Sequence, residues 1–186
     1  MADNVFIDGN KIYLRALEKS DLKNVLKWVN DPDVTYYMVT GQKPSTLQDL
    51  EKDYEATAGS GRDIVFAMID KQTNRHIGNI GLYNIRPVSC ITELRIIIGE
   101  KNVWGKGVGA EACMLIVKYA FDRLNLNKVF LGVNKDNNGG VKCYVNAGFV
   151  EEGVLRDEIY RNGRFYDALR MSILKKEYEN NPIYRT

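Results

Sequence analysis

The chain has 186 residues, of which 45% are hydrophobic and 27% are charged. These proportions are typical of a folded globular protein and exclude a disordered, collagen-like or disulfide-scaffold protein. The 26 Lys and Arg residues nearly balance the 24 Asp and Glu residues, so the net charge of +2 argues against a nucleic-acid partner. Because no apolar run reaches the length of a membrane helix, we expect no membrane partner. The length of the chain predicts a single domain over residues 1–186.

A strand followed by a helix is predicted at the beginning of the chain. Polar and apolar residues alternate from Lys11 to Leu17, which is typical of a half-buried strand. Ser20 and Asp21 then supply oxygens that can accept hydrogen bonds from the first turn of a helix. This helix should end at Asn30-Asp31-Pro32, because a proline disfavours helical geometry in the residue before it.

A second helix is predicted after residue 44. Ser45 and Gln48 have the spacing of a capping box, in which each side chain satisfies a free backbone N–H of the other. The helix should run to about Thr57, because Gly59 and Gly61 follow directly.

The middle of the chain predicts a sheet with one parallel strand pair. Short apolar segments at Ile64–Ile69, His76–Leu82 and Glu93–Ile98 are separated by turn residues, which favours antiparallel strands. A long helix from Val108 to Ala120 is then indicated by its apolar spacing, and Lys128–Asn134 reads as the next strand. A strand, a crossover helix and another strand imply a parallel pair.

The last part of the chain predicts a short helix and a hairpin. The helix should cover residues 140–146, and the hairpin strands Val154–Tyr160 and Asp167–Leu174 should turn at Asn162-Gly163, a strong hairpin signal. With no repeat or linker, the whole chain is expected to be an α+β domain whose mainly antiparallel sheet is flanked by helices.

The cysteines favour a cytoplasmic protein without a metal site. Cys90, Cys113 and Cys143 are an odd number, include no closely spaced pair, and accompany a single histidine, His76. Buried free thiols in a reducing compartment are the simplest interpretation. The beginning of the chain also lacks a basic and apolar leader pattern.

The most informative segment runs from Trp104 to Glu111, directly before the predicted long helix. Its three glycines, Gly105, Gly107 and Gly109, let backbone N–H groups approach a ligand, and the helix start adds partial positive charge. This combination predicts a phosphate-binding turn, although a glycine turn that binds nothing has the same appearance.

Two nucleotide-binding motifs can be compared with this segment. A Walker A loop is excluded, because Lys106 is followed by Gly107 rather than by Ser or Thr. The dinucleotide fingerprint is satisfied by Gly105, Gly107 and Ala110. However, residues 99–104 separate these glycines from the strand, and the following strand ends at Asn134 instead of an acidic residue.

A third interpretation is a family resemblance. The glycine run resembles the acyl-CoA pyrophosphate loop Gln/Arg-x-x-Gly-x-Gly/Ala of the GNAT N-acetyltransferases, with Trp104 as a departure in the first place. The resemblance covers nearly the whole chain, from Tyr13 through the Trp28–Pro32 step to Gly148-Phe149 and Asn162-Gly163. It is greatest to the branch that includes ribosomal-protein alanine and spermidine acetyltransferases.

The resemblance implies the donor, acetyl-CoA, and the residues that contact it. A splayed parallel strand pair should expose the main chain near Ile97 to the pantetheine and to the oxyanion. The residues expected to contact acetyl-CoA, by resemblance, are Ile96, Ile97, Ile98, Trp104, Gly105, Lys106, Gly107, Val108, Gly109, Ala110 and Asn137.

The resemblance also implies two catalytic residues. An alkylamine with a pKa near about 10 must lose a proton before it attacks the thioester, and Glu93 matches approximately the family's general base. Tyr144 matches the family's general acid for the leaving thiolate, in the pattern that contains Asn137, Gly148 and Phe149. An exposed strand carboxylate and a packed tyrosine are the plain structural interpretations of the same residues.

The expected activity is transfer of an acetyl group to a primary amine by direct attack in a ternary complex. The acceptor, a small molecule or a peptide, is left open between a protein N-terminus, a polyamine and an aminosugar. An aromatic-rich cleft is expected to bind it, lined by Tyr36, Tyr37, Met38, Tyr83, Tyr160 and Tyr166. Open alternatives are a covalent route through Cys90 or Cys143, a non-catalytic acyl-CoA-binding regulator and an NAD-dependent oxidoreductase. A homodimer is also compatible with the sequence.

Overall fold

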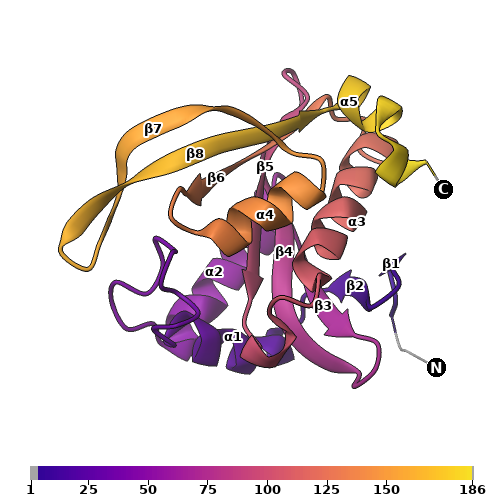
Figure 1. Cartoon of the computed structure of the whole chain (residues 1–186). Coiled ribbons are helices and arrows are strands. Elements are labelled where there is room, and N and C mark those ends of the chain that lie inside the picture. The colour runs from indigo at the N-terminus through magenta and orange to yellow at the C-terminus, as the bar shows by residue number, and fades with distance from the viewer. Residues whose placement is uncertain (1–3, 186) are drawn as a thin grey trace.

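A computed structural model describes residues 4–185. Its centre is one sheet in the order β1-β2-β3-β4-β5-β6-β8-β7, in which every neighbouring pair is antiparallel except β5 and β6. Figure 1 shows the sheet with helices on both faces and the β7–β8 hairpin extending from one side. The strands are β1 Ile7–Asp8, β2 Ile12–Ala16, β3 Ile64–Asp70, β4 Arg75–Arg86, β5 Ile91–Ile98, β6 Lys128–Asn134, β7 Val150–Arg161 and β8 Arg164–Leu174.

The helices pack on opposite faces of the sheet. The α-helices are α1 Leu22–Val29, α2 Leu47–Ser60, α3 Val108–Asp122, α4 Asn138–Asn146 and α5 Lys175–Asn180. Buried residues of α3, such as Ile116, form the main core with Leu94 of β5 and its neighbours. On the other face, Trp28 of α1 packs with Ile97, which lies three residues after Leu94 on the same strand. The α+β prediction with one parallel pair is confirmed.

Several local predictions differ from the structure. The N-cap of α2 is Thr46, which exchanges hydrogen bonds with Asp49, one position beyond the predicted pair Ser45 and Gln48. The sequence Ser-Thr-Leu-Gln-Asp offers both registers, and the Asp carboxylate is the stronger acceptor for the Thr46 hydroxyl and N–H. This helix also passes Thr57 and ends at Ser60, with left-handed Gly61 following it.

The first helix has a different start from the predicted cap. The Asp21 side chain accepts no hydrogen bond from the first turn of α1. Its carboxylate instead accepts the N–H of Glu18 at 2.9 Å and binds Arg15 through two hydrogen bonds of 2.7 and 2.8 Å. The predicted hairpin turn is confirmed, since Asn162 and Gly163 both have positive φ angles, 50° and 82°. The two-residue β1 and the C-terminal α5 were not predicted.

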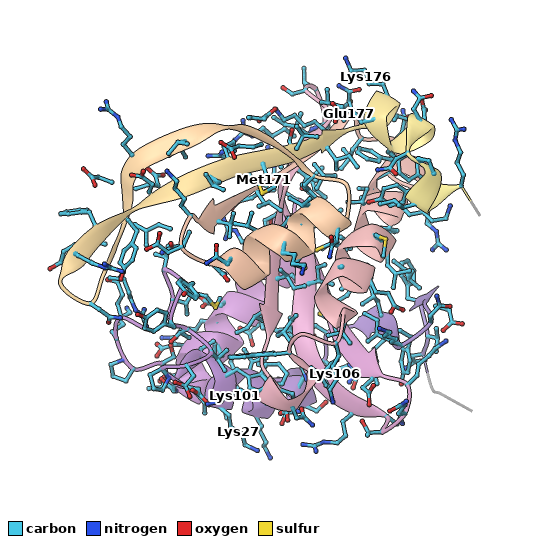
Figure 2. The ribbon with its side chains drawn as sticks, in the orientation of Figure 1. Lys27, Lys101, Lys106, Met171, Lys176 and Glu177 are labelled. Atoms are coloured by element: carbon cyan, nitrogen blue, oxygen red, sulfur yellow. The ribbon has the colours of Figure 1, made fainter. Side chains whose placement is uncertain are left out.

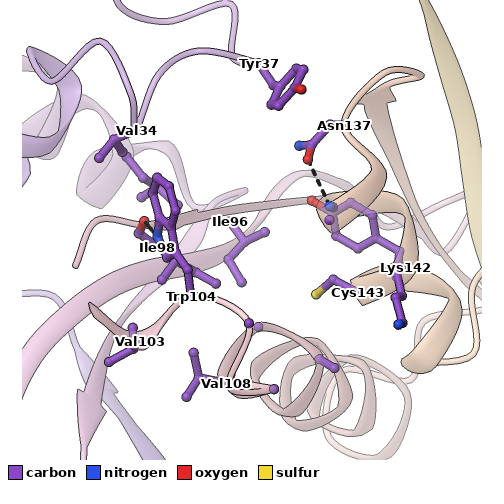
Figure 3. A pocket seen from close by; sticks show the side chains of 18 of the residues that line it. Val34, Tyr37, Ile96, Ile98, Val103, Trp104, Val108, Asn137, Lys142 and Cys143 are labelled. Atoms are coloured by element: carbon purple, nitrogen blue, oxygen red, sulfur yellow. Dashed lines mark hydrogen bonds between the residues drawn. The ribbon is translucent and has the colours of Figure 1, made fainter. Parts of the chain in front are cut away.

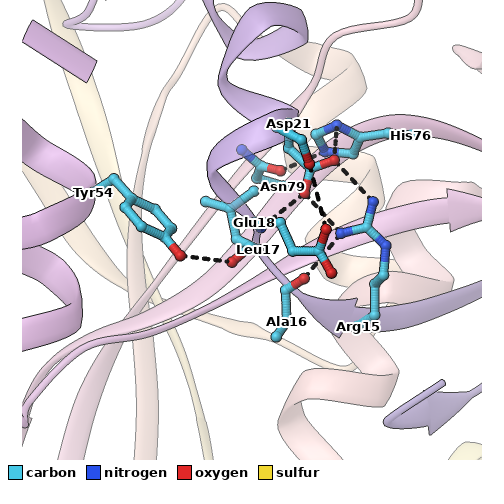
Figure 4. A network of polar contacts seen from close by, with 9 residues as sticks. Arg15, Ala16, Leu17, Glu18, Asp21, Tyr54, His76 and Asn79 are labelled. Carbon is cyan, nitrogen blue, oxygen red and sulfur yellow. Dashed lines mark hydrogen bonds and ion pairs between the residues drawn. The ribbon is translucent and has the colours of Figure 1, made fainter. Parts of the chain in front are cut away.

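Beneath α1, a buried polar network joins Asp21 and Arg15 to the histidine of the chain (Figure 4). His76 is 8% exposed, and its Nε2 lies 2.7 Å from Asn79 Oδ1, while Nδ1 lies 3.5 Å from Asp21 Oδ1 without a hydrogen bond. Burial lowers the pKa of His76 from 6.5, although Asn79 and Asp21 both favour its protonated form. The folded protein therefore holds this imidazole neutral.

We predict that this histidine makes the fold less stable in mild acid. A group with a lowered pKa binds more protons when unfolded, so stability is lost as the pH falls below the ordinary value of 6.5. The free energy of unfolding in urea should fall by up to about 1.4 kcal/mol per pH unit between pH 6.5 and 5. His76→Gln should flatten this slope whatever its effect on stability at pH 7; an unchanged slope would assign the effect to other groups.

Candidate functional site

A wedge opens between β5 and β6 because their parallel pairing is short. The two strands pair only from Ile91 with Lys128 to Glu93 with Phe130. Beyond Glu93, β5 continues to Ile98 beside β4, whereas β6 continues beside β8. One edge of β5 is therefore separated from β6 over residues 94–98, which leaves space for an extended ligand to lie along the strand.

The glycine turn at the end of this wedge leads into α3. Gly105 and Gly107 have φ angles of 71° and 83°, a left-handed geometry that favours glycine, and Gly107 is the N-cap of the helix. A Cβ at Gly105 would meet nothing within 4 Å, so the turn is open at this residue. The free N–H groups and positive end of a 15-residue helix make this an anion-binding position.

A lysine from the other end of the sequence supports the turn. Lys11 Nζ donates a 2.7 Å hydrogen bond to the carbonyl oxygen of Lys106, and a Cβ at Gly107 would lie 3.3 Å from it. Lys106 itself is exposed, at the end of the molecule where Figure 2 also labels Lys101. The role of Lys11 could not be predicted from the sequence, because nothing local to it signals a contact 95 residues away.

Trp104 stands where the family motif has Gln or Arg. Its indole Nε1 donates a 2.9 Å hydrogen bond to the carbonyl oxygen of Ile98, while the side chain remains 42% exposed. Figure 3 shows the ring beside Val34, at the edge of the pocket. The indole thus joins the end of β5 to the glycine turn and covers the Ile98 carbonyl.

A cavity of about 610 Å³ connects the wedge, the glycine turn and α4. Its lining includes every residue predicted to contact acetyl-CoA except Lys106, together with Tyr144 of the predicted catalytic pair. Glu93 is not part of the lining. Apart from Tyr37 and Met38, the lining residues that were not predicted to contact acetyl-CoA or to act in catalysis are Asp33, Val34, Val103, Gly139, Gly140, Lys142, Cys143 and Asn146, of which Cys143 was considered only for a covalent route. The α4 residues among them lie within the motif that contains Asn137 and Tyr144.

The fourth helix presents Tyr144 to the cavity. Asn137 begins this helix by accepting the N–H of Gly140 at 2.9 Å, and a Cβ at Gly140 would approach Asn137 Nδ2 to 2.7 Å. A larger residue at position 140 would therefore require the Asn137 side chain to shift. Burial raises the pKa of the Tyr144 phenol, and the thiols of Cys113 and Cys143 add to the effect. The phenol therefore stays protonated at neutral pH and can donate a hydrogen bond to an acceptor in the cavity.

Glu93 is held by its neighbour on β5. Its Oε1 and Oε2 accept hydrogen bonds from Arg95 at 3.0 and 2.8 Å, and the guanidinium lies 4.8 Å from the centre of the Tyr83 ring. The side chain of Glu93 is 28% exposed. Each carboxylate oxygen keeps a lone pair free for a water or another donor.

The opposite wall of the cavity is the segment between α1 and α2. Tyr37 and Met38, two of the predicted acceptor residues, line the cavity together with Asp33. Lys101 Nζ bridges Asp33 at 2.6 Å and Asp31 at 2.9 Å, and its hydrogen bonds lower the pKa of Asp31. The other predicted aromatics do not line this cavity: Tyr36 packs edge-on against Tyr37, Tyr83 lies under Arg95, Tyr160 packs on Phe165, and Tyr166 lies under Arg164.

Within residues 4–185, no group of three or more His, Cys, Asp or Glu side chains is arranged to hold a metal ion. None of the helices in this described part is long and apolar enough to cross a membrane. The cavity fits an acyl-CoA, because an open anion-binding turn, a free strand edge and the Tyr144 phenol all line it.

Comparison with known proteins agrees with this geometry. Residues 11–150 match the model of the acetyltransferase (GNAT) domain. The chain is 33% identical over 173 residues to spermidine N(1)-acetyltransferase of Vibrio cholerae, covering 92% of this chain and 98% of that protein. It is 36% identical over 178 residues to the putative ribosomal N-acetyltransferase YdaF of Bacillus subtilis, covering 90% and 93%.

A solved structure has the same fold. The crystal structure of the Vibrio cholerae spermidine N-acetyltransferase, in complex with CoA and spermine, superposes with a TM-score of 0.84 at 32% identity. The superposition covers 92% of this chain and all of that one. The chain therefore belongs to the GNAT acetyltransferases, and it is an N-acetyltransferase that takes its acetyl group from acetyl-CoA and transfers it to an amine.

Proposed function

We propose that the enzyme acetylates a polyamine by direct attack of a terminal amine on the bound thioester. One observation carries this proposal: a single cavity is lined by the splayed strand, the glycine turn and Tyr144, and also by Tyr37, Met38 and Asp33 on the opposite wall. A donor along β5 and an acceptor at the opposite wall meet in one space, so a ternary complex needs no covalent acyl-enzyme.

The choice of a polyamine rests on two supports. Relatives in Vibrio cholerae and Escherichia coli bear the name spermidine N(1)-acetyltransferase, at 33% and 31% identity. At the acceptor wall, the Tyr37 ring offers a surface for a cation, and the carboxylate of Asp33, which also binds Lys101, lines the same cavity. The apolar Met38 beside them suits the methylene spacers of a polyamine.

Release of free CoA from acetyl-CoA tests the acceptor. With the purified enzyme, spermidine should give saturable CoA release and a product heavier by one acetyl group, whereas an alanine-terminated peptide should give little. CoA release with the peptide and not with spermidine would show that the acceptor is a protein N-terminus and not a polyamine. The name of the YdaF relative makes this the second candidate. Absence of turnover with every amine, despite acetyl-CoA binding, would instead support the non-catalytic regulator.

Within this reaction we assign roles to two side chains. Glu93 takes the proton of the attacking amine, through water because the carboxylate does not line the cavity. Tyr144 donates a hydrogen bond to the sulfur as the thiolate leaves. Main-chain groups of β5 near Ile97 meet the oxyanion.

We also propose a cytoplasmic location and a homodimer. Cys90, Cys113 and Cys143 are free thiols, which supports a reducing compartment.

The β7 edge of the sheet is exposed at Val150 and Val154, which supports pairing with a second copy. Light scattering of the purified protein should give twice the chain mass.

A further inference from the structure

The acceptor wall is built from a segment without regular secondary structure. Residues 31–46, between α1 and α2, contain only turns and bends, yet Tyr37 and Met38 of this segment line the cavity. Such a segment lacks the repeating backbone hydrogen bonds of a helix or strand, so its position depends on individual anchors. One anchor is Lys101, which holds Asp31 and Asp33 from the side of the glycine turn.

A second anchor comes from the far end of the β7–β8 hairpin. Arg161, the last residue of β7, is 9% exposed. Its Nη1 donates to the carbonyl oxygens of Thr40 at 2.8 Å and Met38 at 3.3 Å, and its Nη2 donates to Thr35 Oγ1 at 3.2 Å. In Figure 1 the hairpin bends toward the segment that leads into α2.

The partners of this guanidinium are neutral, which is unusual for a buried charge. Carbonyl and hydroxyl oxygens compensate part of the lost hydration of the arginine, and each bond to a charged donor is stronger than one between neutral groups. Three such bonds converge on residues 35–40 from a residue more than 120 positions away. The arrangement therefore fixes the segment rather than neutralising a carboxylate.

Thr35 extends the contact back to the beginning of the segment. This residue is 1% exposed, and its hydroxyl accepts from Arg161 while donating to the carbonyl oxygen of Asp31 at 2.9 Å. Gly41, with a φ of 87°, packs so tightly that a Cβ there would lie 2.5 Å from Thr35 Oγ1. Gln42 Nε2 adds a 3.2 Å bond to the carbonyl oxygen of Tyr160 on the hairpin.

We infer that Arg161 is a positioning residue that clamps the acceptor wall to the hairpin and thereby sets the affinity for the amine. It does not line the cavity itself; it holds the backbone of Met38, whose side chain does. The inference rests on the proposed function in one respect, the entry of the amine at this wall. The donor half of the cavity is built from other elements, β5, α3 and α4, and does not depend on the clamp.

The test compares Arg161→Met, which removes the donors, with Arg161→Lys, which keeps the charge, and with Arg156→Met as control. Arg156 is an exposed arginine on the same strand, so this control removes one charge without touching the segment. With spermidine as the probe, Arg161→Met should raise the acceptor KM about tenfold or more, because hydrogen bonds to a charged group are lost. Arg161→Lys should recover part of the loss, and Kd for acetyl-CoA should stay within about twofold in all variants.

Hydrogen exchange provides a readout that needs no acceptor. The amides of residues 35–42 should exchange faster in Arg161→Met than in the Arg156→Met control, with the strands of the sheet unchanged. Unchanged exchange in this segment, or an equal loss of acetyl-CoA affinity, would overturn the clamp. If spermidine is not acetylated by the unmodified enzyme, the proposed acceptor fails, while exchange and acetyl-CoA binding still decide the role of Arg161. Should Arg161→Met fail to fold, Arg161→Lys gives the same comparison.

Discussion

Tyr144→Phe should lower kcat by about 10²–10³-fold and leave Kd for acetyl-CoA unchanged. The phenol lines the cavity, and burial raises its pKa, so it remains a hydrogen-bond donor throughout the reaction. A donor aimed at charge that develops only in the transition state contributes to kcat rather than to binding, typically by about this factor. Phenylalanine keeps the ring and its packing against Phe149 and removes only the hydroxyl.

The raised pKa also defines what kind of acid Tyr144 is. The conjugate acid of the leaving thiolate has a pKa near about 8.5, below that of any phenol whose pKa burial has raised. Complete proton transfer to sulfur would therefore be uphill, and the hydroxyl acts by stabilising the thiolate as the carbon–sulfur bond breaks. Steady-state kinetics and calorimetry with acetyl-CoA measure the two quantities. Tyr160→Phe, at an exposed tyrosine of the hairpin, is the control, and an equal kcat in both variants would remove Tyr144 from the mechanism.

Glu93→Gln should lower kcat/KM by about 10²-fold or more at pH 7, and the loss should become smaller as the pH rises toward the pKa of the amine. An alkylamine with a pKa near about 10 is almost wholly protonated at neutral pH, so a base is needed there and becomes dispensable in alkaline solution. Glutamine keeps the shape of the side chain and one acceptor for Arg95. The expected result is therefore a change in the pH profile, which a purely structural role would not produce.

The contact between Glu93 and Arg95 means that the experiment needs a control for a purely structural effect. Both oxygens of Glu93 accept hydrogen bonds from the guanidinium, so the substitution also changes the contact with Arg95. Glu151→Gln, an exposed carboxylate on β7, serves as the control. A pH profile of Glu93→Gln parallel to that of the unmodified enzyme would show that the amine reaches the cavity already deprotonated, and that Glu93 only positions Arg95.

Most of the fold could be predicted because its signals are local. Alternation predicted β2, a short apolar segment between turn residues predicted β3, and the Asn162-Gly163 pair predicted the turn of the last hairpin. The misses have local causes too. At the N-cap of α2, Ser45 and Thr46 compete and their partners lie one residue apart. At the beginning of β7, three exposed residues in a row, 150–152, hide the strand pattern.

The candidate site could likewise be predicted where its residues belong to one local motif. Residues within one motif, such as Gly107 and Gly109 or Asn137 and Tyr144, line one cavity in the structure. The dinucleotide alternative suggested by the same glycines is wrong, since the chain belongs to the GNAT acetyltransferases. A sequence motif marks where a backbone can approach a ligand, but it does not show which fold surrounds it.

The sequence by itself determined the order of the elements from β2 to β8 and the glycine turn, because each depends on neighbouring residues along the chain, and the family resemblance singled out Tyr144. The tertiary structure decided which residues support them: Lys11 behind the glycine turn, and Lys101 and the hairpin residue Arg161 on the acceptor segment. These are hydrogen bonds or ion pairs between residues that are 68 to 126 positions apart, and no local pattern encodes such contacts. They appear only when the sheet order brings distant strand ends and loops together.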